Sequence, residues 1–144
     1  MNKKILIVIL GLIVVTTFVG SAKADITVSI EVKDSSSSGA SLISGKTVPI
    51  NTMAYVYGHY EDLSGNTPAS ALMEAYYDDG SGLTYVATLF SGIVNDGDTV
   101  MGEPYAMTKL GTYEFRWTCT KEIIDRDHGV RILCREERAQ ARTT

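Results

Sequence analysis

Polar and apolar residues alternate one by one in several short segments after residue 25, which is the pattern of a strand with one buried face. The first such segment, residues 26–32, reads ITVSIEV and places its isoleucines and valines on one side. The clearest, residues 111–119, reads GTYEFRWTC and places four side chains on one side, namely Tyr113, Phe115, Trp117 and Cys119. We therefore expect strands that cover a core with one face and meet solvent with the other.

Similar signals recur along the chain as far as residue 134. The further expected strands lie at residues 47–60, 71–77, 83–90, 99–101 and 128–134. The acidic, glycine-rich segment DDGSG, residues 78–82, joins two of them and predicts a hairpin. About seven strands and no helical spacing of apolar residues after residue 24 predict an all-β fold, an antiparallel β-sandwich.

Residues 1–24 have the three parts of a signal peptide: a start with lysines, an apolar run and the small-residue ending SAKA. We expect cleavage after Ala24, so that a helical signal peptide precedes a sandwich of residues 25–134. The alternative is a retained membrane anchor, because residues 5–22 just reach the length that spans a bilayer. The prediction is a secreted or cell-surface protein that touches the membrane only through an uncleaved N-terminal segment.

The charge of the processed chain argues against nucleic acid as a partner. Removal of residues 1–24 takes away three lysines and no acid, which changes the net charge from −4 to −7. Nucleic-acid binding is driven by Lys and Arg side chains that displace counterions from phosphates. Basic residues gather only near the end, and we expect residues 135–144 to form a charged, frayed tail.

Two cysteines are present, Cys119 and Cys134, and export to an oxidising compartment favours a disulfide between them. If the two face each other across an antiparallel pair, Lys121 pairs with Ile132 and the turn falls at residues 125–128. The bridge would close a loop of about 15 residues and brace the last hairpin.

Residues 109–115, KLGTYEF, resemble the corner of immunoglobulin-like domains, where a glycine and then a tyrosine two residues later open the penultimate strand. The resemblance implies an immunoglobulin-like sandwich of the kind common in prokaryotic exported and surface proteins. It also implies that Gly111 makes the tight corner and that the Tyr113 hydroxyl bonds to an upstream backbone group. Two features depart from antibody domains: Phe115 stands in place of their second core cysteine, and Trp117 lies on a different strand from their core tryptophan. A fold of this kind implies no particular ligand.

Aromatic residues give the sequence a candidate binding face. Tyrosine suits sugar stacking and protein contact because it joins a large apolar ring to a hydroxyl group. The candidate residues are Tyr55, Tyr57, His59, Tyr76 and Tyr85. The alternative is that these side chains make ordinary core and cross-strand contacts.

Two acidic turns are candidate calcium sites. Asp78 and Asp79 precede one glycine, and Asp96 and Asp98 flank another, so each turn offers the oxygen ligands that calcium prefers. The alternative is turn chemistry, for which Asp and Gly are equally suited. No other cofactor is expected.

These observations favour a non-catalytic exported module for adhesion, recognition or envelope assembly, with an unidentified cell-surface protein or glycan as its partner. One alternative is a structural surface component that assembles by edge-strand or face contacts. Another is a small secreted hydrolase or inhibitor, for which His59 beside Glu61 and Asp62 is the best candidate cluster. The oligomeric state stays open.

Overall fold

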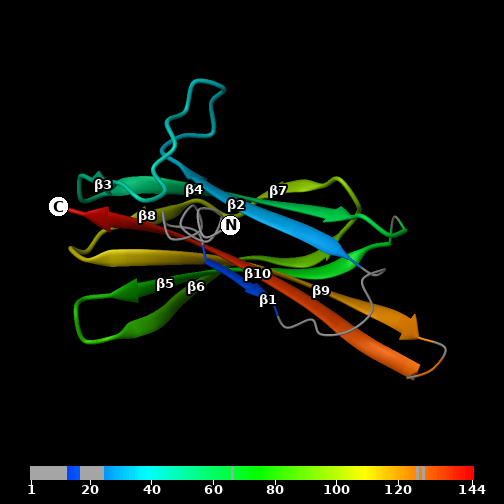
Figure 1. Ribbon diagram of the computed structural model, residues 1–144. Coiled ribbons are helices and arrows are strands. Elements are labelled where there is room, and N and C mark those ends of the chain that lie inside the picture. The colour runs from blue at the N-terminus through cyan, green and yellow to red at the C-terminus, as the bar shows by residue number, and fades with distance from the viewer. Residues whose placement is uncertain (1–12, 17–24, 66, 126, 128) are drawn as a thin grey trace, which may run out of the picture.

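A computed structural model describes residues 13–16, 25–65, 67–125, 127 and 129–144. All of the regular secondary structure in these residues is β-strand (Figure 1). The strands are β1 (Ile13–Thr16), β2 (Ile26–Lys33), β3 (Thr47–Val48), β4 (Thr52–Asp62), β5 (Ala69–Asp78), β6 (Leu83–Val94), β7 (Thr99–Met101), β8 (Tyr105–Met107), β9 (Thr112–Asp125) and β10 (Gly129–Thr143). The all-β prediction is confirmed.

The strands form two sheets. The six-stranded sheet has the order β1-β10-β9-β5-β6, with β3 beside β10. The four-stranded sheet has the order β2-β4-β7, with β8 beside β4. All pairs are antiparallel except β3 with β10. The two sheets lie one above the other in Figure 1, an arrangement compatible with the predicted sandwich.

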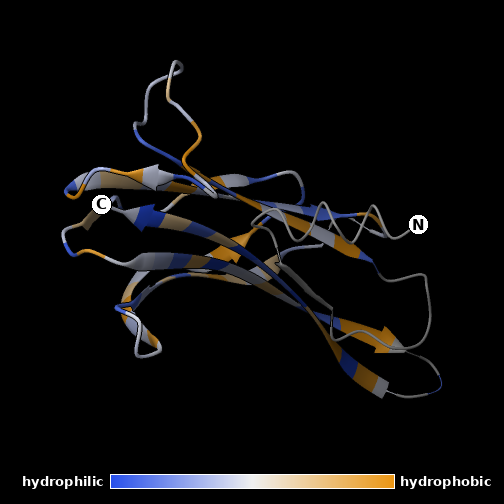
Figure 2. Cartoon of the chain, turned by 60° about the vertical axis from the view of Figure 1, so that its left-hand side comes forward, coloured by the Kyte–Doolittle hydropathy of each residue, from blue (hydrophilic) through white to orange (hydrophobic). Residues whose placement is uncertain are grey.

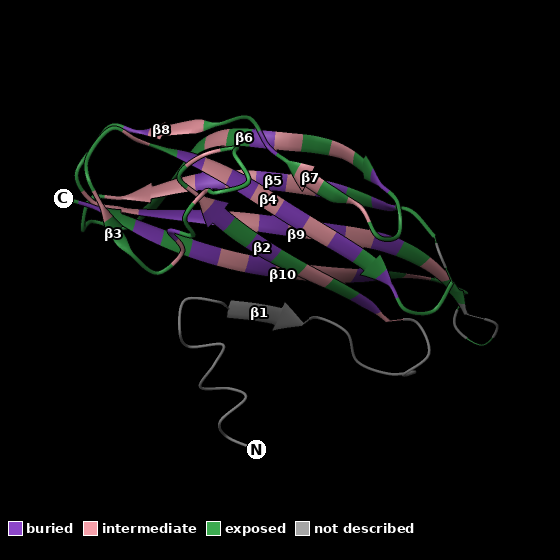
Figure 3. Cartoon of the chain, turned by 90° about the horizontal axis from the view of Figure 1, so that it is seen from above, coloured by how far each residue is buried: buried purple, intermediate pink, exposed green. Residues whose placement is uncertain are grey.

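The core lies between the sheets and follows the alternation of the sequence. Buried and exposed residues alternate along most strands, as the bands in Figure 3 show. Apolar positions alternate with polar ones along the same strands in Figure 2. The largest fully buried side chains are Trp117, Tyr60, Tyr113 and Phe115. The Trp117 indole N–H donates to the His59 carbonyl oxygen at 3.0 Å and so links β9 to β4, one strand from each sheet.

The single strand expected at residues 47–60 is divided in two. Its break lies at residues 49–51, between β3 and β4. Pro49 has no backbone N–H for a ladder, and Asn51 has a positive φ of 71°. The Asn51 N–H donates to the Met107 carbonyl oxygen at 2.8 Å, which holds the turn against β8. The two halves consequently join different sheets.

The predicted disulfide is wrong, because the last hairpin pairs one residue away from the expected register. Cys119 pairs with Arg135, and Cys134 pairs with Thr120. Neighbouring residues of a strand point to opposite faces, so this one-residue shift separates the two sulfurs. Cys119 is buried in the core, Cys134 lies on the outer face of the six-stranded sheet, and the two are not bonded to each other.

The frayed tail expected at residues 135–144 is wrong as well. Strand β10 continues to Thr143 and pairs with β9 as far as Arg142. Ala139 and Ala141 alternate with Gln140 and Arg142, and both alanines are buried. The tail was expected to fray because its apolar residues do not have helical spacing. Their spacing of two residues instead suits a strand.

The expected signal peptide falls mainly outside the described residues. Its only described part, Ile13–Thr16, forms β1 at one edge of the six-stranded sheet and is not helical. Among the residues that the structure describes, no helix has the length and apolar character to cross a membrane.

Candidate functional site

The candidate tyrosine face is divided between opposite sides of the molecule. Tyr55, Tyr57 and His59 alternate with buried residues of β4 and point outward from the four-stranded sheet. Tyr76 and Tyr85 lie on the outer side of the six-stranded sheet, where their rings pack edge to face at 5.9 Å. These residues therefore do not form one surface.

His59 sits between a hydroxyl and a carboxylate on the outer face of β4. Its Nδ1 lies 2.8 Å from Thr99 Oγ1, and its Nε2 lies 3.1 Å from Glu61 Oε1. A hydrolytic site also needs donors aimed at a developing oxyanion. The His59 backbone is instead paired with Ser29 and Thr99 on the two neighbouring strands. The His59 side chain thus links β4 to β7 through Thr99. The His59 backbone is used for strand pairing and does not form an oxyanion hole.

Ion pairs cover the middle of the six-stranded sheet's outer face. Arg116 donates to Glu114 at 2.6 Å, and Arg138 donates to Glu136 at 2.6 Å. The Arg116 guanidinium also lies 4.0 Å from the centre of the Tyr76 ring. Because these charges are already partnered, this part of the face offers little to a ligand.

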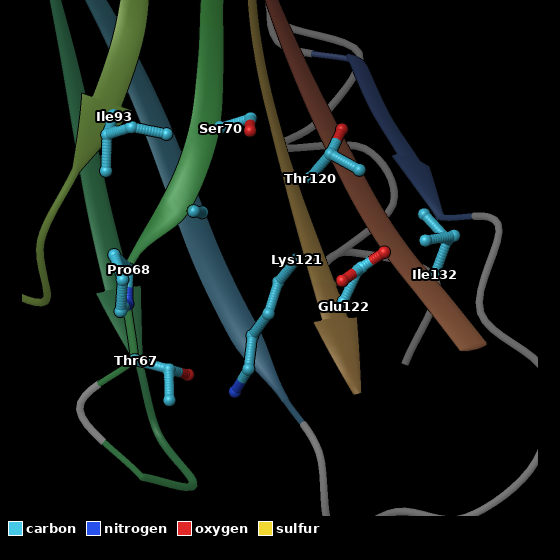
Figure 4. A pocket seen from close by; sticks show the side chains of 9 residues that line it. Thr67, Pro68, Ser70, Ile93, Thr120, Lys121, Glu122 and Ile132 are labelled. Atoms are coloured by element: carbon cyan, nitrogen blue, oxygen red, sulfur yellow. The ribbon is translucent and has the colours of Figure 1, made fainter. Parts of the chain in front are cut away.

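One end of the same face is different, because a groove lies where β5 begins and the β9–β10 hairpin extends beyond it (Figure 4). The groove has a volume of about 530 Å³. Ile93 of β6 and Ile132 of β10 stand on its two sides, with Ser70 and Thr120 between them. A neighbouring hollow shares Ser70, Ile93 and Thr120 and reaches Leu72.

Large aliphatic side chains are exposed around this groove. The exposed fractions are 88% for Ile124, 65% for Ile93, 63% for Val130 and 59% for Ile132. We call these four residues the apolar end. Such a patch marks an interaction surface more often than a solvated one. Sequence reasoning missed it because both alternating sets of β10 contain apolar residues, so alternation did not show which set faces solvent.

A buried ion pair lies beside the groove and joins the two sheets. Lys121 Nζ of β9 lies 2.7 Å from Asp62 Oδ2 of β4. Asp62 also accepts bonds from the backbone N–H and hydroxyl groups of Ser64 and Thr67. Burial alone would raise the pKa of Asp62, but these bonds outweigh it and hold the pKa far below its usual range.

The two acidic turns lie at opposite ends of β6, so their carboxylates do not form one site. Asp78 accepts the N–H groups of Gly80 and Gly82, and Asp98 accepts the N–H of Asn95. Asp79 accepts bonds from Ser81, and Asp96 accepts the N–H of Asp62. Within the described residues, no group of three or more His, Cys, Asp or Glu side chains is arranged to hold a metal ion. Asp78, Asp79 and Asp98 thus bond within their own turns, and Asp96 bonds to the end of β4.

The corner residues lie at the start of β9. The Tyr113 hydroxyl accepts the Lys109 N–H at 3.0 Å and donates to the Lys109 carbonyl oxygen at 3.3 Å. Gly111 has a φ of 151°, and a Cβ there would overlap the Asp78 carbonyl oxygen. The corner thus needs glycine for both conformation and space.

Comparison with known proteins does not place the chain in a family. No family model, curated protein or solved structure matches it.

Proposed function

We infer that this chain is an exported, non-catalytic immunoglobulin-like module that binds a protein partner through the apolar end of its six-stranded sheet. The observation that carries the inference is the groove between Ile93 and Ile132, both more than half exposed. Aliphatic walls around a hydroxyl-lined floor suit a protein segment. A glycan is less well served, because the exposed tyrosines lie elsewhere.

The immunoglobulin-like assignment is supported by strand order and by the corner. Strands β10-β9-β5-β6 form one layer, and β2-β4-β7 form the other. Tyr113 is the second residue of the penultimate strand, β9, and its hydroxyl bonds to the backbone four residues upstream. Sandwiches of this class place such a tyrosine at the start of the penultimate strand.

The signal-peptide pattern of residues 1–24 supports export. The surroundings of His59 support a non-catalytic role. Both ring nitrogens of His59 face groups on an open sheet surface. The groove contains neither His59 nor a cysteine.

A photo-activated cross-linking residue tests the binding surface in the producing cells. At position 93 it should give an adduct with another protein, and Ile132→Lys should reduce the yield of that adduct. The matched control is position 110, where Leu110 is 61% exposed but lies away from the groove. Equal yields at the two positions would contradict the binding surface.

Export is tested separately by the intact mass of the protein recovered outside the cytoplasm. We expect a chain that begins at Asp25. A chain that stays in the cytoplasm would refute export, and an exported chain that begins at Met1 would refute cleavage after Ala24.

A further inference from the structure

Strand β10 pairs with β9 along one of its edges, and its other edge is covered in parts by β1 and by the segment that leads into β3. Near its end, the Gln140 carbonyl oxygen accepts the Gly45 N–H at 2.6 Å, and the Arg142 N–H donates to Lys46 at 2.9 Å. In the middle, β1 pairs with Arg135–Arg138. If residues 1–24 are removed, as the proposed function requires, β1 leaves with them.

The direction of the backbone groups follows from these contacts. Gln140 and Arg142 turn their backbone N–H and C=O groups away from β9, so the other even-numbered residues of β10 do the same. Strand β1 pairs only with Arg135–Arg138, and no other described strand pairs with this edge between Gly129 and Ala139. We call Gly129–Ala139, as it stands after loss of β1, the vacated segment. Native sheets normally protect such an edge, since its unsatisfied groups are a template for another strand.

The vacated segment fits a second copy of itself. Its middle residue is Cys134, so an antiparallel pair covers the whole segment only when a two-fold axis passes through Cys134. Val130 then pairs with Arg138 of the second copy, and Ile132 with its Glu136. These are the positions that β1 occupies, where Ile13 pairs with Arg138 and Val15 with Glu136.

Charge selects the same register. With the axis at Cys134, Arg131 lies opposite Glu137 of the second copy, and the symmetric contact repeats this pair. An axis at residue 133 would place Arg131 opposite Arg135, and an axis at residue 135 would place Arg135 opposite itself. Like charges directly opposite each other destabilise a strand pair.

Glu137 supplies an independent reason for a partner here. With β1 in place beside it, Glu137 is only 4% exposed, and its Oε2 has no hydrogen-bond partner among the described residues. A second β10 strand in place of β1 would cover Glu137 again, and its arginine would give the carboxylate the partner that β1 does not supply, which relieves the cost of burying it.

We propose that release of residues 1–24 lets two copies of the chain join their β10 edges around Cys134, with Arg131 of each copy facing Glu137 of the other. This proposal rests on the proposed export and deepens it, because it names a second copy as the partner of the edge. It leaves the Ile93 side of the groove available for a different protein.

The test uses the full chain with a specific protease site inserted after Ala24, so that it does not depend on natural processing. Sedimentation should show a monomer before cleavage and a dimer after it. Arg131→Glu should weaken the cleaved dimer about tenfold or more, since it sets like charges opposite each other twice. Adding Glu137→Arg should restore the dimer, and Arg142→Glu, on the covered part of the edge, should leave it unchanged.

Oxidised glutathione then reports the register. Hydrogen-bonded antiparallel neighbours have Cα atoms about 5.5 Å apart, within reach of a disulfide. Two Cys134 thiols and one oxidised glutathione should give one Cys134–Cys134 disulfide and two reduced glutathiones. A cleaved chain that stays monomeric at about millimolar concentration, a dimer without this cross-link, or a charge exchange without recovery would each overturn the proposal. None of these outcomes bears on the position 93 adduct or on export.

Discussion

At the scale of single residues, close packing against Trp117 explains why β4 has a glycine in its middle. Gly58 is buried in the strand, and a Cβ there would overlap the Trp117 indole ring. The alternating pattern of residues 47–60 shows that position 58 faces inward. It does not show that the Trp117 ring lies so close that only glycine fits there.

Gly58→Ala should lower the free energy of unfolding by about 1 to 3 kcal/mol, because the extra methyl group overpacks the core. Denaturant unfolding followed by Trp117 fluorescence would measure the loss. Gly39→Ala is the matched control, since a Cβ at Gly39 meets nothing within 4 Å. Equal effects of the two substitutions would contradict the packing argument.

Tyr113→Phe should cost about 1 to 3 kcal/mol of stability, because it leaves the Lys109 N–H without the hydroxyl that accepts it, although the Lys109 carbonyl keeps its bond from Thr143. Chemical denaturation of both forms gives the difference. Tyr55→Phe, on the outer side of β4, should change the midpoint little. An unchanged midpoint for Tyr113→Phe would show that the corner bond contributes nothing.

At the scale of elements, alternation predicted most strands but left the register of the last hairpin undecided. In β10, Val130 and Ile132 form one alternating set and Leu133 lies in the other, so each set offers apolar residues to a core. The cysteine pair favoured the first set. Burial of Leu133, Ala139 and Ala141 together favours the second, because a longer strand then covers the core.

This register predicts different reactivity for the two thiols. Burial raises the pKa of Cys119 to about 12. Brief treatment of the monomer with iodoacetamide at pH 8 should label Cys134 and leave Cys119 unmodified, as read by peptide mass spectrometry. Both thiols should react in denaturant. If neither reacts there until a reductant is added, the two cysteines form the internal disulfide after all.

At the scale of the whole molecule, the buried pair of Asp62 and Lys121 ties the two sheets together at one end. Asp62→Asn should cost about 3 to 5 kcal/mol, because Lys121 then keeps a buried charge without its partner. Asp34→Asn, at an exposed loop position, should cost much less. The double variant Asp62→Leu/Lys121→Met should lose less than the sum of its single changes, and full additivity would exclude coupling.

Asp62 also affects the acid side of the stability profile. Its pKa is lower in the folded chain than its ordinary value of 3.8. The unfolded chain therefore binds the proton first, so the stability from this group is present above about pH 4 and falls on acidification. Urea unfolding at pH 7 and pH 3 should show a smaller acid loss in Asp62→Asn than in the unchanged protein.

Glu137 acts with the opposite sign at higher pH. Burial raises its pKa from 4.5 to about 7 in the folded chain. Between these values the folded chain holds the proton more tightly, so stability should fall as pH rises and reach a lower level above pH 7. Glu137→Gln should remove this fall and raise stability at pH 8 by up to about 3 kcal/mol. Glu136→Gln, on the outer face, is the control, and a profile unchanged by Glu137→Gln would contradict the assignment.

Most of the strands could be predicted from the amino-acid order alone, because the side-chain alternation of a pleated strand is local and can be read one residue at a time. The break at residues 49–51 and the extension of β10 to Thr143 could not. The corner at Gly111 and Tyr113 could also be predicted, because the bonding partner of the Tyr113 hydroxyl lies only four residues away. The folded chain was needed to show which side of β10 is buried, that Asp62 meets Lys121, and that Ile93 and Ile132 border one groove. Those relations join residues far apart in the chain, and they depend on strand order and on a register that a shift of one residue reverses.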